Sequence, residues 1–173
     1  TVHVLTITAG YAGFLLALGL GHIVLWNAAL RPEQDEQIGS LHDALYRAVQ
    51  VGVLLLAAGT ILGGVWANYS WGRFWGWDPK ENGAALVVLN AAIILHARWG
   101  GMIRHRGLFI LAVGGNIVTA WSWFGTNMLG VGLHSYGFMD SAAMWLMAFI
   151  ILQLLIIGLG LTPRALRRTP PTT

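Results

Sequence analysis

The sequence contains no cysteine and little charge. None of its 173 residues is Cys, and only 10% are Asp, Glu, Lys or Arg, against about 25% in a typical soluble domain. The missing Cys excludes disulfides, thiolate metal ligands and thiol nucleophiles from this chain, so a metal could bind only to His, Met or carboxylate groups. Because 56% of the residues are hydrophobic, the shortage of charge indicates a membrane protein.

The hydrophobic residues gather in five runs of about the length, roughly 20 residues, that a helix needs to cross a bilayer. The runs are apolar on all sides and lack the alternation of a barrel strand, which favours helices. They cover approximately residues 4–30, 48–69, 79–97, 108–125 and 141–161. The predicted fold is therefore all-α, an integral membrane bundle of about five transmembrane helices in a lipid bilayer.

The basic residues predict the orientation of this bundle, since Lys and Arg collect in cytoplasmic loops. With residue 1 outside, only Arg73 and Lys80 lie outside with it. We therefore expect an extracytoplasmic N-terminus, a membrane core over residues 1–162 and a basic, Pro/Thr-rich cytoplasmic tail over residues 163–173. The basic residues form no dense patch, which argues against nucleic acid as a partner. On the cytoplasmic side this orientation places Arg31, Arg47, Arg98, Arg104, Arg106, Arg164, Arg167 and Arg168.

Residues 71–83, WGRFWGWDPKENG, combine tryptophans with charged side chains, and their carboxylates have a local explanation. Asp78, Pro79 and Glu81 fit the N-cap, the first helical residue and the acid of a capping box. This pattern predicts a helix that begins directly after Asp78. It accounts for both carboxylates without any ligand.

The tryptophans of the same segment have two interpretations. A single indole near a helix end is usually an anchor at the membrane interface. Several indoles beside the cations Arg73 and Lys80 predict instead an extracytoplasmic aromatic shelf for a flat, apolar, dianionic ligand. Haem b fits, because its ring can lie against aromatic faces while Arg or Lys meets the propionates. The indoles concerned are Trp71, Trp75 and Trp77, with Trp66, Trp121 and Trp123 approaching the same surface.

Two histidines, His3 and His134, fall on the predicted outer face beside the tryptophans. A neutral imidazole coordinates iron, and two of them can fill both axial positions of haem. The alternative for each is a hydrogen-bonded polar residue near a helix end. The sequence thus offers His3 and His134 as candidate axial ligands.

Two longer motifs carry a resemblance to a known family. WGRFWGWDPKE resembles the tryptophan-rich signature of the haem-handling proteins of cytochrome c maturation, and NMLGVGLHSYGF is similar to the segment that follows it in the CcsA/ResC branch. The resemblance implies that the tryptophan-rich segment, with Trp123, binds haem at the outer face between His3 and His134. It also implies that His96, in ILHARWGG, belongs to an inner haem site, from which haem passes outward.

The same resemblance implies partners. The products would be c-type cytochromes, whose apoprotein carries a CxxCH motif that receives the haem. The family's inner site takes its second histidine from an earlier helix or from a CcsB/ResB-type membrane partner, and no segment here clearly matches it. The chain begins with Thr1 rather than Met. We interpret this as a core cut from a longer protein, whose missing N-terminal region could supply that ligand.

The position of His96 agrees with an inner site. Asp78 and His96 are 18 residues apart, which corresponds to about 27 Å along a helix. His96 should therefore lie about one membrane thickness from the tryptophans, near the cytoplasmic end. The alternative is an interfacial residue beside Arg98.

The remaining histidines offer weaker candidates. His22 lies in the inner half of the first predicted helix, so it could substitute for the second inner ligand, although packing is its ordinary explanation. His42 and His105 fall in cytoplasmic connections, where solvated surface is expected. Tyr46 and Arg47 could contact the propionates of an inner haem.

The sequence predicts a haem-binding protein of the cytoplasmic membrane that presents haem at the outer face for covalent attachment to apocytochrome c. Such a chain could be part of a holocytochrome c synthase, with a role based on positioning, because no acid–base catalyst stands out. Two alternatives are open. One is a haem exporter or chaperone without synthase activity, and the other is a membrane b-type cytochrome that transfers electrons.

Overall fold

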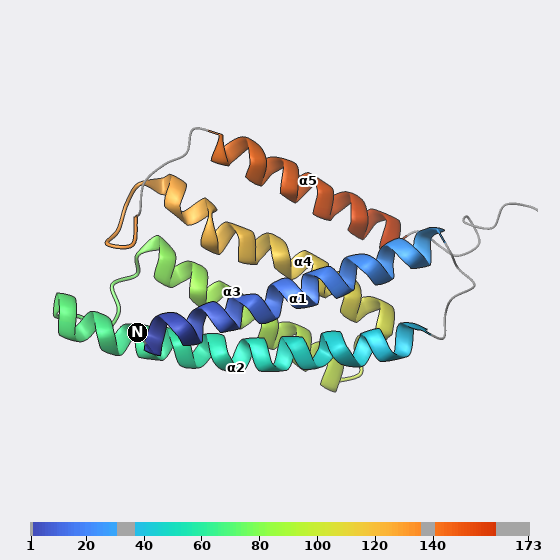
Figure 1. Cartoon of the computed structure of the whole chain (residues 1–173), viewed down its shortest axis with the longest axis horizontal. Coiled ribbons are helices and arrows are strands. Elements are labelled where there is room, and N and C mark those ends of the chain that lie inside the picture. Colours follow the sequence, from blue (N-terminus) through green and yellow to red (C-terminus); the bar gives the residue numbers. More distant parts are fainter. Residues whose placement is uncertain (1, 31–36, 136–140, 162–173) are drawn as a thin grey trace, which may run out of the picture.

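Five long α-helices and one short 3-10 helix form the described part of the chain, residues 2–30, 37–135 and 141–161, in a computed structural model (Figure 1). These ranges contain no strand, which confirms the all-α prediction. All five long helices are long and apolar enough to cross a membrane. The predicted tail, residues 163–173, lies outside the described residues. The elements are α1 (Val2–Leu30), α2 (Gln37–Trp71), α3 (Pro79–Trp99), α4 (His105–Trp123), η1 (Gly125–Leu129) and α5 (Ala142–Leu161).

The largest departure from the predicted boundaries is at the start of α2. The helix begins at Gln37 instead of near residue 48. Its first turns carry polar residues among buried ones such as Leu45, so they do not form a continuous apolar run. A smaller departure is at α4, which ends at Trp123 and is followed by the 3-10 helix. The predicted fourth run had ended at residue 125.

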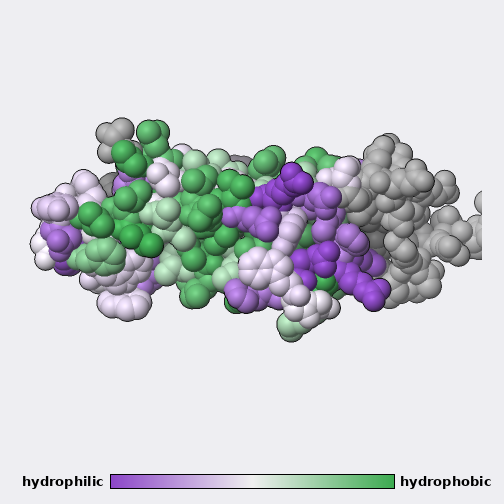
Figure 2. All heavy atoms as spheres, turned by 90° about the horizontal axis from the view of Figure 1, so that it is seen from below, coloured by the Kyte–Doolittle hydropathy of each residue, from purple (hydrophilic) through white to green (hydrophobic). Residues whose placement is uncertain are grey.

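The bundle has two ends that differ in composition. The start of α1, the end of α2, the start of α3 and η1 lie at one end (Figure 1). We call this the tryptophan end. The starts of α2 and α4 lie at the opposite end. Figure 2 shows a hydrophobic band between polar surfaces, as expected of a membrane-spanning bundle.

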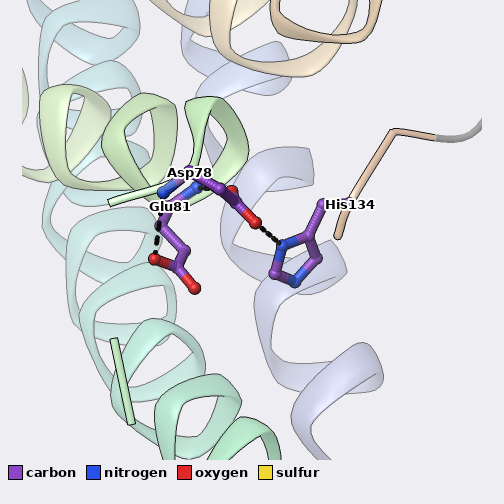
Figure 3. A group of neighbouring side chains, drawn as sticks. All are labelled: Asp78, Glu81 and His134. Carbon is purple, nitrogen blue, oxygen red and sulfur yellow. Dashed lines mark hydrogen bonds and ion pairs between the residues drawn. The ribbon is translucent and has the colours of Figure 1, made fainter. Parts of the chain in front are cut away.

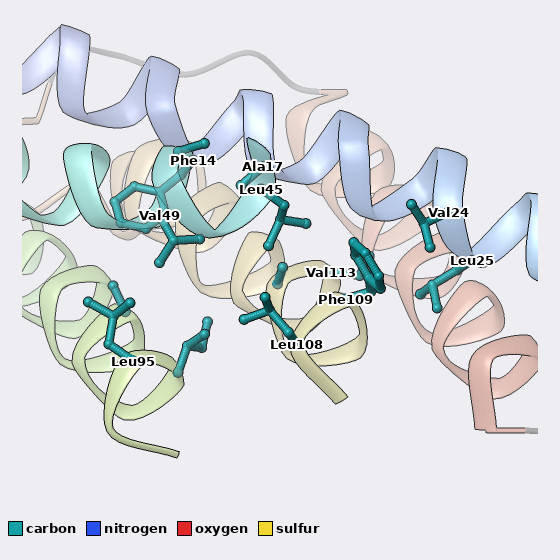
Figure 4. Close-up of a cluster of buried hydrophobic side chains, with 14 of the residues drawn as sticks. Phe14, Ala17, Val24, Leu25, Leu45, Val49, Leu95, Leu108, Phe109 and Val113 are labelled. Atoms are coloured by element: carbon teal, nitrogen blue, oxygen red, sulfur yellow. The ribbon is translucent and has the colours of Figure 1, made fainter. Parts of the chain in front are cut away.

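The buried core joins the first four helices, and Ile156 of α5 also contributes to it. Figure 4 shows side chains from α1, α2, α3 and α4 pointing into one cluster. Leu45, Leu108 and Val113 in this cluster are fully buried, and Phe109 nearly so. Such close packing is the main source of association between helices in a bilayer, where lipid is as apolar as the side chains.

Glycines let α1 and α2 touch through their backbones. A Cβ added to Gly10 would lie 2.7 Å from the backbone nitrogen of Leu56, and one added to Gly59 would lie 2.8 Å from that of Ile7. Real Cβ atoms are essentially never found this close to another atom. The small residues therefore hold residues 7–10 of α1 against residues 56–59 of α2.

Candidate functional site

A partly open cavity of about 190 Å³ lies at the tryptophan end, between α1, α2, α3 and α4. It brings together five of the ten site residues predicted from the sequence. These are His3, Trp75, Lys80, Trp123 and His134. The other five, Trp71, Arg73, Trp77, Asp78 and His96, do not line this cavity.

His3 reaches the cavity from the first turn of α1. Its Nδ1 lies 2.8 Å from the backbone oxygen of Gly59 in α2. A carbonyl oxygen can only accept, so Nδ1 carries the proton and donates it. The lone pair then resides on Nε2. This is the tautomer in which a histidine binds a metal through Nε2 while its other nitrogen is held by an acceptor.

His134 enters the cavity from the segment after η1 and is held in the same way. Its Nδ1 lies 2.5 Å from Oδ2 of Asp78 (Figure 3). Burial works to raise the pKa of Asp78, but hydrogen bonds from His134 and from the backbone N–H groups of Glu81 and Lys80 outweigh it, and the pKa lies below its ordinary value. The carboxylate is therefore ionised and accepts a hydrogen bond from the Nδ1–H of His134, so in the neutral imidazole the lone pair is on Nε2.

Asp78 is also the N-cap of α3, as the sequence predicted. Its Oδ1 accepts from the Glu81 N–H at 3.0 Å, and Oε2 of Glu81 accepts from the Asp78 N–H at 3.3 Å. Pro79 occupies the first turn, where its missing N–H costs nothing. The capping box is thus confirmed, and the second oxygen of Asp78 remains for His134. One carboxylate links the start of α3 to a candidate ligand.

The loop that carries His134 approaches Asp78 closely because of a glycine. Gly132 has a φ of 89°, which few other residues adopt, and a Cβ there would lie 2.8 Å from the Cβ of Asp78. The ring of Trp71 packs edge-on against His134 with centroids 4.9 Å apart. Trp71 therefore contacts a candidate ligand without lining the cavity itself.

The two predicted cations have different surroundings. Nη1 of Arg73 donates to Glu81 Oε1 at 3.0 Å, and its Nη2 lies 4.0 Å from Asp78 Oδ2. Arg73 is thus paired within the loop. Lys80 does line the cavity, and its ammonium donates to the backbone oxygens of Ser122 and Trp123. A cation suits these carbonyls, because they belong to the negative end of the α4 dipole.

The tryptophans divide into those that line the cavity and those that surround it. Trp75 and Trp123 line it. The ring of Tyr11 lies 4.9 Å from that of Trp123, and its hydroxyl is 2.9 Å from Ser122 Oγ. Trp77 is 74% exposed and packs edge-on against Trp75 at 6.0 Å. The aromatic wall is therefore narrower than the predicted shelf, and it includes Tyr11.

Sequence reasoning missed Tyr11 and several small residues. His3, Ile7 and Tyr11 all line the cavity at a spacing of four residues, so they lie along one face of α1. That spacing was visible in the sequence once His3 had been singled out. Gly63 and Gly64 also line the cavity, but their contribution depends on the distance between helices, which no local pattern gives.

His96 lies in the last turns of α3, far along the helix from Asp78, as its spacing predicted. Its Nδ1 is 2.7 Å from the Ala92 oxygen, and its exposed ring packs 5.3 Å from that of Trp99. The Trp99 indole donates to the hydroxyl of Tyr46 in α2. Tyr46 is thus joined through Trp99 to the surroundings of His96, whereas Arg47 is exposed.

The prediction that His42 belongs to a solvated surface is wrong. His42 is only 4% exposed, because α2 begins before it and carries it inside the bundle. Its ring lies 4.2 Å from that of His105, which is exposed as expected. His22 is half-buried and bonds through Nδ1 to the Leu18 oxygen of its own helix at 2.8 Å.

Comparison with known proteins gives one consistent result. A family model described as "Cytochrome C assembly protein" matches residues 1–134. The chain is similar to the cytochrome c biogenesis protein CcsA of Parasynechococcus marenigrum (strain WH8102), with 41% identity over 129 residues, which cover 74% of this chain and 41% of the relative. With CcsA of Microcystis aeruginosa (strain NIES-843 / IAM M-2473), the identity is 43% over 110 residues, 64% of this chain and 34% of the relative. The chain therefore matches about two fifths or less of the length of these relatives.

Proposed function

Because the chain belongs to the cytochrome c assembly protein family, we propose that it binds haem b at the tryptophan end and presents it to apocytochrome c. A role in cytochrome c biogenesis and a multi-pass membrane location follow from the family and from the five membrane-capable helices. The haem site, its ligands and the attachment step are the proposal.

One observation carries the proposal. His3 and His134, from distant parts of the sequence, line the same cavity, and each has Nδ1 on an acceptor so that the lone pair resides on Nε2. This donor set suits the two axial positions of haem iron, which imidazole nitrogens fill in b-type sites. The anionic Asp78 would also increase the basicity of His134 as a ligand.

The rest of the cavity suits the haem ring. Trp75 and Trp123 offer aromatic surface, and Lys80 is the cation on the described cavity wall that can meet a propionate. To do so, its ammonium would exchange the backbone oxygens of Ser122 and Trp123 for the propionate. Because the cavity is partly open, one edge of the ring would remain outside it.

Haem is the substrate of this site, and its vinyl groups supply the chemistry. Each thiol of the CxxCH motif forms a C–S bond to one vinyl carbon, and its proton passes to the other carbon. The residues of this chain bind and orient the ring and hold its reactive edge toward the partner. Arrival of the CxxCH histidine would displace one of the two imidazoles.

We further propose that the tryptophan end faces outward across the cytoplasmic membrane, with the C-terminus in the cytoplasm. His96, at the opposite end, would bind haem on the inner side before it moves outward. A CcsB/ResB-type partner, or a further region of the protein, would supply the second inner ligand. The exposed position of the His96 ring on α3 leaves its surface accessible to such a partner.

Replacing each histidine by glycine tests the axial pair. His3→Gly or His134→Gly should lower the haem content of the purified protein, because one imidazole is removed from the iron. Free imidazole should restore the haem spectrum by entering the space that the side chain left. His105→Gly, at an exposed position of the opposite end, is the matched control and should keep its haem without imidazole.

Full haem content in both outer variants without imidazole would refute the axial assignment. Haem that responds to imidazole but never reaches an added apocytochrome would favour the exporter or the b-type cytochrome over presentation for attachment. Membrane levels should be similar in all variants, since neither imidazole belongs to the buried hydrophobic core.

A further inference from the structure

Gly63 in α2 lies directly beneath the ring of His3. The three nearest heavy atoms to a Cβ added at residue 63 all belong to this imidazole, namely Cε1 at 2.5 Å, Nδ1 at 3.0 Å and Nε2 at 3.2 Å. A contact of 2.5 Å cannot be accommodated without movement. A side chain at residue 63 and the observed ring position of His3 therefore exclude each other.

Two contacts hold α1 against α2 beside His3. Gly59, one turn before Gly63 in α2, lies against the backbone of Ile7 in α1. A Cβ added to Gly59 would lie 2.8 Å from the backbone nitrogen of Ile7. The Gly59 oxygen also accepts a hydrogen bond from the Nδ1–H of His3. Moving α1 away from α2 would break these contacts, so rotation of the His3 side chain is the less costly relief. That rotation would break the hydrogen bond to Gly59 and take the ring out of the cavity.

We propose that Gly63 is a positioning residue for the outer haem site. Because it lacks a side chain, it leaves the space in which the His3 imidazole lies, and we call this space the seat of His3. The inference rests on the proposed function, in which His3 is an axial ligand. Gly59 and Gly63 thus differ in role although they share one face of α2. Gly59 allows the two backbones to touch, whereas Gly63 leaves room for a ring.

The test combines Gly63→Ala with imidazole rescue. Gly63→Ala alone should lower the haem content toward that of His3→Gly. In the His3→Gly background, free imidazole occupies the seat of the lost ring, and the methyl group that Gly63→Ala introduces would fill that seat. Because overpacking typically costs about 1–3 kcal/mol, the imidazole concentration for half-maximal rescue should rise by about fivefold or more.

Gly19→Ala and Gly158→Ala are matched controls, because a Cβ at either membrane glycine would meet no atom within 4 Å. Each should leave the haem content unchanged and the imidazole rescue of His3→Gly intact. Unchanged haem in Gly63→Ala, or equal imidazole rescue of His3→Gly with and without the Gly63→Ala substitution, would overturn the proposal. If His3→Gly itself keeps its haem, the axial assignment fails instead.

Membrane level supplies a second measurement if Gly63→Ala accumulates poorly. The clash is with His3, so the double variant His3→Gly/Gly63→Ala should regain the level of His3→Gly alone. A level that stays low in the double variant would mean that the added methyl group disturbs something other than His3, and this result also overturns the proposal.

Discussion

Asp78 performs two tasks with one carboxylate. One oxygen caps α3, and the other holds Nδ1 of His134 in the cavity. We expect Asp78→Asn to reduce haem affinity by about 10–100-fold, the usual effect of losing a residue that orients a metal ligand. An amide carries no charge and makes a weaker acceptor for the imidazole N–H. Haem titration of the purified apoprotein measures the change.

Asp43→Asn is the matched control for this prediction. Asp43 also lies beside a histidine, with its Oδ1 3.1 Å from Nδ1 of His42, but this pair is at the opposite end of the bundle. Its loss should leave the outer haem affinity unchanged. Equal effects of the two substitutions would mean that Asp78 acts through general stability rather than through His134.

The lowered pKa of Asp78 also sets a pH dependence. Because the folded pKa lies below the ordinary value of about 3.9, the carboxylate stabilises the fold above about pH 4. This contribution is lost as the pH falls through the folded pKa. The stability difference between the unaltered protein and Asp78→Asn should therefore be present at neutral pH and shrink below about pH 4 in thermal unfolding.

The segment between α2 and α3 presents two neighbouring tryptophans differently. Trp75 lines the cavity, whereas Trp77 is 74% exposed, has a φ of 57° and has its backbone oxygen held by Asn82. Trp75→Leu should therefore lower haem content or shift the haem spectrum. Trp77→Leu should do so much less, at similar membrane levels. The reverse order would indicate that haem lies on the outside of the segment rather than in the cavity.

The sequence predicts a helix boundary correctly where local capping residues mark it, and less well where only an apolar run marks it. The capping residues Asp78, Pro79 and Glu81 fixed the start of α3 correctly, because capping depends on neighbours in the sequence. The start of α2 was missed, because residues such as His42 are buried by other helices and not by their own apolar run. Burial of this kind depends on tertiary packing.

The sequence also predicts part of the candidate site, since five of its ten predicted residues line the cavity. The sequence predicts His3 and His134 as a pair on the outer face, and both line one cavity in the structure. The pairing of Arg73 with Glu81 and the contribution of Tyr11 were not foreseen. Both depend on how the loop and the helices meet, which composition and motif spacing do not determine.

At the scale of the whole molecule, the two ends should lie on opposite sides of the membrane. Since the chain has no native Cys, single introduced cysteines report this directly. Ser70→Cys and Ser135→Cys, at the tryptophan end, should react with an impermeant thiol reagent added outside. Met102→Cys and Asp43→Cys, exposed at the other end, should react only after the membrane is opened. The opposite pattern would place His3 and His134 in the cytoplasm and refute the outward presentation of haem.

The contact of α1 with α2 through their glycines has a consequence for biogenesis. His3 finds its Gly59 acceptor as soon as the first two helices have been made, whereas His134 follows only after α4. In the order of synthesis, the first imidazole and its acceptor therefore precede the second imidazole. If both imidazoles bind haem as proposed, capture by the pair requires synthesis through residue 134, so an emerging chain would not close around haem before its first four helices have been made.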